Sequence, residues 1–186
     1  MSEQDGFAEM TASMKKAAAA LRDAGVPHLL GGGLALWAYG APETGHDVDF
    51  LVKPEDAERA AAALGEAGMR IEQPPEEWLV KAFDGDVLID LIHEPTSGPI
   101  TDETLERGRE LEVLAMRIPV ARAEDVMAQK LLSISEHEPD FSSVLEPARA
   151  LREQIDWDDV RRRTESSAFA RAFFTIAEGL EIVQTR

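Results

Sequence analysis

Residues 31–52 have the sequence GGGLALWAYGAPETGHDVDFLV and contain the clearest structural signal in the chain. This run begins with three glycines and ends in a segment, residues 47–52, in which acidic and apolar side chains alternate. Alternation predicts a β-strand, because successive side chains of a strand point to opposite faces. The expected faces are Val48, Phe50 and Val52 on one side and Asp47, Asp49 and Leu51 on the other.

The two aspartates of this expected strand are candidate metal ligands. Residues i and i+2 of a strand share a face, with Cα atoms about 6.6–7 Å apart. Asp47 and Asp49 could therefore hold one Mg²⁺ between them, or bracket two metal ions about 3.5–4 Å apart. The alternative is a solvated strand face, because a short motif of this kind is common and needs structural context.

A third acid, Asp90, lies in the segment VLIDLI, where its five neighbours are apolar. The surrounding sequence predicts a hairpin with strands at residues 78–83 and 86–92 and Asp84-Gly85 as its turn. A buried carboxylate is costly unless it is paired or binds a metal, so Asp90 is a candidate third ligand. The alternative is that one face of the hairpin is half solvated, as is common in antiparallel sheets.

The glycines at positions 31–33 lie between a short expected strand, residues 28–30, and an apolar helical stretch, residues 34–39. Glycine lets backbone N–H groups approach a ligand closely, and a helix N-terminus attracts anions, so this turn is a candidate triphosphate cradle. The alternative is a tight turn that binds nothing. No Gly-Lys-Ser/Thr follows and the glycines do not form Gly-x-Gly-x-x-Gly, which disfavours a Walker loop and a Rossmann dinucleotide site.

The remaining patterns predict an α/β (α+β) fold, with a mixed sheet flanked by helices and a helical C-terminal region. We expect a core over residues 1–119 and a helical region over residues 120–186 that packs on the core, with a single domain as the alternative. Further helices are expected at residues 7–23, 54–68, 101–109, 123–134, 140–153, 156–163 and 168–182, and further strands at 69–71 and 111–118.

Composition limits the classes of function. The chain has 186 residues, a net charge of −17 and no cysteine, which excludes disulfides and thiolate metal sites. No apolar run approaches the roughly 20 residues that cross a bilayer, and the N-terminal sequence lacks the pattern of a secretory signal, so we expect a cytoplasmic protein without membrane contact. The negative charge disfavours nucleic acid and favours a cationic partner, unless it is only a solubility trait.

The order of these motifs resembles the nucleotidyltransferase superfamily. A strand, a Gly-Gly turn, a helix, Asp-Val-Asp-Phe-Leu-Val and a later strand with a third Asp are similar to the pattern of this superfamily over about residues 26–93. Its members include kanamycin and lincosamide nucleotidyltransferases, minimal MNT antitoxins, AbiEii-type toxins and family X DNA polymerases. Residues 123–140 resemble the AbiEii-like helical region more weakly.

The resemblance implies a role for each matching residue. Gly32 and Gly33 would contact the β- and γ-phosphates of a nucleoside triphosphate (NTP), and Asp47 and Asp49 would hold Mg²⁺, or Mn²⁺, on that triphosphate. Asp90 would share a second metal and act as the general base on an attacking hydroxyl.

Two further residues are candidate phosphate contacts. Thr44 corresponds to the threonine of an Arg-x-Thr motif that many relatives carry before the aspartates, although the arginine is missing here and the spacing is shifted. Lys130 could neutralise phosphate, and its alternative is a surface lysine beside an apolar helix stripe. The three tryptophans, Trp37, Trp78 and Trp157, are expected to be packing residues, and the alternative is that they are platforms on which bases stack.

Two functional hypotheses follow. The first is an Mg²⁺-dependent enzyme that transfers a nucleoside monophosphate to a hydroxyl on a small molecule, a protein or an RNA end, with release of pyrophosphate. The second is a non-catalytic interaction module of the same fold, such as an antitoxin with a toxin-like protein partner. The missing arginine and the strong acidity favour the second hypothesis, whereas the three aspartates favour the first.

Overall fold

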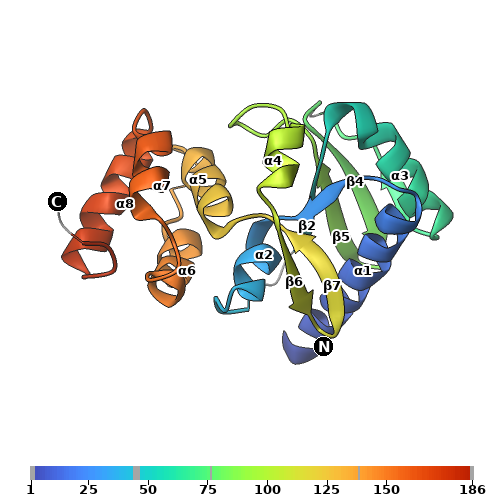
Figure 1. Cartoon of the computed structure of the whole chain (residues 1–186), viewed down its shortest axis with the longest axis horizontal. Coiled ribbons are helices and arrows are strands. Elements are labelled where there is room, and N and C mark those ends of the chain that lie inside the picture. The colour runs from blue at the N-terminus through green and yellow to red at the C-terminus, as the bar shows by residue number, and fades with distance from the viewer. Residues whose placement is uncertain (1–2, 44–46, 76, 138, 185–186) are drawn as a thin grey trace.

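The computed structural model describes residues 3–43, 47–75, 77–137 and 139–184 and contains one seven-stranded mixed sheet with helices on both sides (Figure 1). The strand order is β3-β4-β5-β2-β1-β7-β6. The strands are β1 (His28–Leu30), β2 (Asp47–Val52), β3 (Arg70–Glu72), β4 (Leu79–Asp84), β5 (Val87–Ile92), β6 (Arg109–Val113) and β7 (Met116–Val120). This architecture confirms the predicted fold class.

Helices are interspersed among the strands up to β7, and the last four helices then follow one another without a strand between them. The helices are α1 (Glu3–Asp23), α2 (Gly32–Ala38), the 3-10 turn η1 (Pro54–Asp56), α3 (Ala57–Glu66), α4 (Asp102–Glu106), α5 (Ala123–Ser133), α6 (Ser142–Leu151), α7 (Trp157–Thr164) and α8 (Ala168–Gly179). None of the described helices is both long enough and apolar enough to cross a membrane.

Strand β2 lies at the centre of the sheet, and its pairing determines where the acids lie. It runs antiparallel to β1 and parallel to β5. In the parallel pair, Asp49 lies opposite Asp90, and Asp47 lies opposite Leu88. Because side chains at paired positions of neighbouring strands share a face of the sheet, Asp49 and Asp90 point to the same side.

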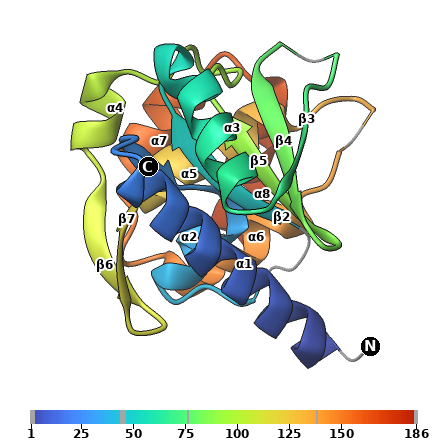
Figure 2. The same cartoon turned by 90° about the vertical axis from the view of Figure 1, so that its right-hand side faces the viewer.

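Helices α1 and α3 cover the other face of the sheet, in front of the strands in Figure 2. Helix α1 buries a stripe at helical spacing that includes Met10, Met14 and Leu21, which explains why it packs there. On β2, Val48 and Phe50 are fully buried. The alternation read from the sequence therefore separates an apolar face of β2 from the face that carries its acids.

The C-terminal helices lie on the side of the sheet that α1 and α3 leave uncovered, where α5 contacts α2 (Figure 1). Buried residues of the sheet, of α2 and of α5–α8 belong to one continuous hydrophobic cluster, which includes Leu34, Val126 and Phe173. Whether residues 1–119 form a unit that folds without residues 120–186 stays a prediction.

Two turns differ from the sequence-based expectation. The single strand predicted at residues 111–118 is wrong, because β6 and β7 form a hairpin whose turn residues, Leu114 and Ala115, have φ values of 51° and 61°. Neither residue type favours positive φ, so the sequence contains no turn signal there. In the β4–β5 hairpin, Asp84 pairs with Val87, so the two-residue turn lies one position later than predicted.

Candidate functional site

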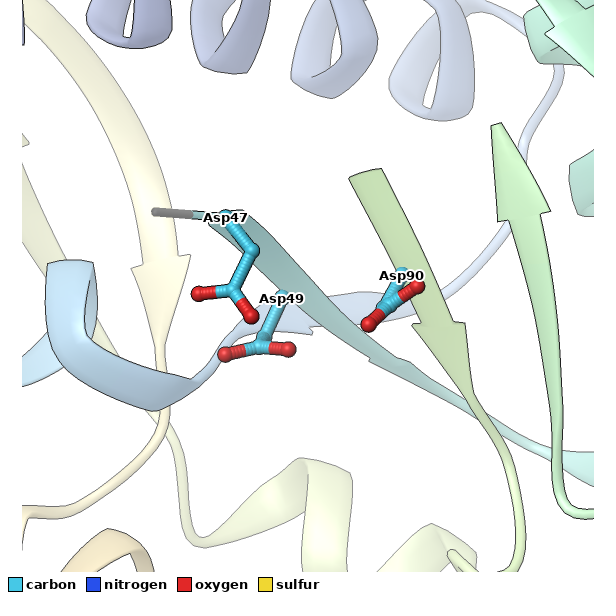
Figure 3. A group of neighbouring side chains, drawn as sticks. All are labelled: Asp47, Asp49 and Asp90. Carbon is cyan, nitrogen blue, oxygen red and sulfur yellow. The ribbon is translucent and has the colours of Figure 1, made fainter. Parts of the chain in front are cut away.

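The side chains of Asp47, Asp49 and Asp90 converge beside the centre of the sheet. One carboxylate oxygen from each residue lies within 4.8 Å of the others, and all three side chains are half-buried. Figure 3 shows Asp47 and Asp49 on β2 and Asp90 on β5, pointing to the same side and away from the blue helix α1. Three carboxylates at this spacing can supply oxygen ligands to a divalent cation.

Asp90 is the least satisfied of these acids. Its Oδ1 atom is buried and accepts no hydrogen bond from the residues that the structure describes. Burial is the main reason that the pKa of Asp90 rises from its ordinary 3.8 to about 6; Lys81, opposite it in β4, lowers the pKa and Asp47 raises it. A solvated strand face would leave this oxygen in contact with water, whereas the oxygen is buried and has no partner among the described residues. These properties fit a metal ligand.

The charges of both other acids act on Asp49. Burial, followed by the charges of Asp47 and Asp90, raises the pKa of Asp49 from 3.8 to about 7, while Lys130 lowers it. The cluster therefore resists carrying three negative charges at neutral pH. A divalent cation would remove that repulsion, which is the electrostatic signature expected of a metal or catalytic site.

The glycine turn lies directly against Asp49. Gly31 donates its backbone N–H to the carbonyl of Asp49 at 2.8 Å. Gly32 has a φ of +55°, and a Cβ atom there would overlap the Asp49 carboxylate. Only glycine satisfies both the backbone conformation and the close approach. Gly33 is half-buried in the first turn of α2.

A cleft of about 370 Å³ begins at this turn. Its lining includes Gly32, Asp49 and Lys130, and it continues to Trp78 and Ile92. Lys130 thus lines the same cleft as Asp49, and its role in neutralising phosphate stays a prediction. The cleft lies between the sheet and α5, which supplies Lys130.

Trp78 lines the cleft, although the sequence predicted a packing role for it. Its side chain is 42% exposed, so the prediction that it is a packing residue is wrong, whereas Trp157 is 9% exposed and packs in the core. An apolar residue at the start of a predicted strand gives no sign of exposure. Trp78 lies just before β4 and is distinguished only by its place in the lining of the cleft.

Two further residues, Thr44 and Asp140, come from the family resemblance. Thr44 lies outside the described residues. Asp140, in the region that resembles AbiEii-like proteins, is exposed and accepts a hydrogen bond from the backbone N–H of Ser142 at 2.9 Å, at the start of α6. Asp140 therefore has a local structural role.

A larger cavity, of about 1020 Å³, lies away from the three acids and is lined by residues that include Arg107, Arg122 and Asp125 together with α7. Asp125 is 5% exposed and accepts hydrogen bonds from Arg107 at 2.7 Å and from Arg163 at 2.6 Å. We call Asp125, Arg107 and Arg163 the arginine cluster. A second carboxylate, that of Asp159, lies 3.2 Å from Arg163, so that two acids face the two guanidinium groups, which is typical of a structural network.

Comparison with a known protein family agrees with the geometry. The sequence profile of the family described as "Uncharacterised nucleotidyltransferase" matches residues 7–181. The chain belongs to this nucleotidyltransferase family. No protein sequence of curated function matches it.

Solved structures share the fold of this nucleotidyltransferase. The solution structure of the antibiotic-resistance factor ANT(2″)-Ia has a TM-score of 0.66 at 17% identity, over 92% of this chain and 98% of its own. The crystal structure of ANT(2″)-Ia in complex with adenylyl-2″-tobramycin has a TM-score of 0.66 at 17% identity, over 87% and 97%. A protein from Thermotoga maritima described as a nucleotidyltransferase has a TM-score of 0.52 at 17% identity, over 63% and 80%. At these identities the likeness concerns the fold.

Proposed function

We propose that this protein transfers a nucleoside monophosphate from a metal–NTP complex to a hydroxyl acceptor and releases pyrophosphate. The observation that carries the proposal is the convergence of Asp47, Asp49 and Asp90 beside the Gly32 turn in a chain of the nucleotidyltransferase family. Phosphoryl and nucleotidyl transfer depends mainly on positioning and on neutralising charge, and this arrangement offers both.

The donor set suits Mg²⁺ or Mn²⁺. The three groups are carboxylates, which these hard cations prefer, and the buried Oδ1 of Asp90 has no partner among the described residues. Asp47 and Asp49 would hold the cation that accompanies the triphosphate, and Asp90 would share a second one. Bound there, the cations would stabilise the charge that develops on the attacking and leaving oxygens.

Asp90 would accept the proton of the acceptor hydroxyl. The acceptor oxygen forms a bond to the α-phosphorus, the bond from that phosphorus to the bridging oxygen breaks, and pyrophosphate leaves with the electron pair. A base is most effective when its pKa lies near the working pH, and burial raises the pKa of Asp90 to about 6. A role as general base would explain why Asp90 is buried and has an oxygen without a described hydrogen-bond partner.

Lys130, Gly32 and Gly33 would hold the phosphates. Lys130 is the cation that faces Asp49 across the cleft, and Gly32 brings the backbone next to the Asp49 carboxylate. Thr44 remains a candidate phosphate contact on the family resemblance alone. Together these groups would orient the triphosphate so that its α-phosphorus lies near Asp90.

The acceptor is proposed to be a small molecule with cationic groups. ANT(2″)-Ia, which shares the fold, is known in complex with an adenylylated aminoglycoside, and the net charge of −17 attracts cations and repels nucleic acid. A toxin-like protein partner stays a prediction of the second hypothesis.

Calorimetric titration of the protein with Mg–NTP tests this function. We expect saturable binding by the wild type, and loss of at least tenfold in affinity for Asp49→Asn, because the variant removes a ligand charge. The matched control is Asp86→Asn, which makes the same change at an exposed position in the β4–β5 turn. Folded wild-type protein with no affinity for any Mg–NTP would exclude the enzyme and favour the non-catalytic module.

A further inference from the structure

The cleft that begins at Asp49 has two chemically different ends. One end carries the charged and glycine residues, Asp49, Gly32 and Lys130, which suit phosphate and metal. The other end carries Trp78, Ile92 and Pro95, which offer aromatic and apolar surface, together with the polar residues Glu94, Thr96 and Ser97. A single small ligand that spans this cleft would therefore have an anionic part and a part that combines a flat apolar face with polar edges.

The indole of Trp78 is held at the margin of the cleft on a fixed backbone. Its carbonyl accepts hydrogen bonds from the backbone N–H groups of His93 at 3.0 Å and Glu94 at 3.2 Å, which tie the start of β4 to the end of β5. The side chain remains 42% exposed even so. An exposed aromatic side chain on a rigid backbone is a surface on which a planar ring can stack.

The other two tryptophans are occupied by packing. Trp37 makes an edge-to-face contact with Phe7, with ring centroids 5.1 Å apart, and Trp157 packs against Phe173 and Phe174. Neither lines the cleft. Trp78 is thus the tryptophan whose position remains unexplained by the core.

Cleft size favours a nucleoside as the occupant of the apolar end. A volume of about 370 Å³ lies at the lower limit of the range for small-molecule sites. This is the volume of the whole cleft, including the part beside Asp49 and Lys130, and a base with its sugar fits inside it. Bases stack on aromatic side chains without strong sequence preference, because every base has a π-face.

We propose that Trp78 is the platform on which the base of the bound nucleotide stacks, and so a further substrate-binding residue of this site. This inference rests on the proposed function. The proposal predicts an effect that the three aspartates alone do not explain. The protein should bind NTP more tightly than the bare triphosphate, and Trp78 should be the reason.

The test compares two ligands, Mg–ATP and Mg–tripolyphosphate, by calorimetry on the full chain. Trp78→Ala is expected to weaken Mg–ATP by about 5- to 150-fold, the range that one lost stacking contact gives, and to leave Mg–tripolyphosphate unchanged. Trp78→Phe should keep most of the affinity for Mg–ATP, because it keeps an aromatic face. Asp49→Asn should weaken both ligands.

Tryptophan fluorescence supplies a second readout that does not depend on the alanine variant. Binding of ATP should change the emission of the wild type and of Trp37→Phe, the matched control, but not that of Trp78→Phe. Unchanged affinity of Trp78→Ala for Mg–ATP, or equal losses for both ligands, would overturn the role of Trp78 and leave the metal site standing. Failure of the wild type to bind either ligand would overturn the proposed function itself, and this proposal with it.

Discussion

The acids at the sheet centre, Asp47, Asp49 and Asp90, and the acid of the arginine cluster, Asp125, have opposite electrostatic surroundings. In the arginine cluster, Asp125 receives two guanidinium groups at 2.7 and 2.6 Å. At the sheet centre, Asp49 has two other carboxylates as neighbours, and burial with their charges raises its pKa to about 7. The first acid is satisfied within the protein, whereas the second requires something that the protein does not contain. We infer from this difference that Asp125 is a structural acid and that Asp49 is a candidate functional one.

Removal of Asp125 should have the largest effect on stability. Asp125→Ala would leave Arg107 and Arg163 without their shared partner and would loosen the contact of α7 with α5. Breaking a buried pair costs about 3–5 kcal/mol, and because the arginine side chains are 38% and 27% exposed we expect about 2–3 kcal/mol. Urea denaturation measures this loss.

The control for Asp125→Ala is Asp23→Ala, which removes the acid of an exposed ion pair with Arg22. Exposed pairs contribute at most about 1 kcal/mol, so the control should unfold almost as the wild type does. Equal losses for the two variants would mean that the arginine cluster is an ordinary surface feature, and the contrast with the sheet centre would disappear.

Gly32→Ala should have the next largest effect, because it introduces strain at the junction of the glycine turn and Asp49. The φ of +55° disfavours alanine, and the added Cβ would overlap the Asp49 carboxylate. We expect a loss of about 2 kcal/mol in unfolding free energy, from backbone strain and displaced packing together, and weaker Mg²⁺ binding.

Gly25→Ala separates the two causes. Gly25 has a similar φ of +65°, but a Cβ there would have no described atom within 4 Å. The control should lose stability by about 1 kcal/mol and keep its Mg²⁺ affinity. If Gly32→Ala also keeps that affinity, the close approach to Asp49 has no functional meaning.

Neutralisation of Asp49 should change stability in the direction opposite to the removal of Asp125. At pH 8 without divalent metal, Asp49→Asn removes a charge that burial and two neighbouring acids disfavour. We therefore expect the variant to be more stable than the wild type by about 1–2 kcal/mol. Thermal denaturation in the presence of a chelator measures this gain, and Asp86→Asn should show none.

Much of this site was predictable because its parts are local. The alternation of residues 47–52, the acid at 90 and the glycine turn are each visible in a short segment, and the hairpin pattern placed Asp90 on a strand. The register that sets Asp49 opposite Asp90 comes from pairing between strands about forty residues apart in sequence. No single segment contains that information.

The features that the sequence did not reveal depend on long-range packing or on atypical residues. The turn at Leu114 and Ala115 has positive φ without glycine or asparagine. The exposure of Trp78 depends on where α5 lies relative to β4, and the pairing of Asp125 joins α5 to α7 and to the residue that follows α4. Patterns within one element cannot predict contacts between elements.

The smallest expected effect is the pH dependence of metal affinity. With a pKa of about 7, Asp49 is mostly protonated at pH 6 and mostly ionised at pH 8, and a proton competes with the metal for the carboxylate. Affinity for Mn²⁺ should therefore fall by about tenfold from pH 8 to pH 6, as one titrating ligand predicts. Calorimetry in buffers of different ionisation enthalpy should also show release of a proton on binding near pH 6.5. Asp86→Asn should retain this dependence. If affinity is constant from pH 6 to pH 8, then no proton on Asp49 competes with the metal in this range, and the contrast between Asp49 and Asp125 rests on their hydrogen-bond partners alone.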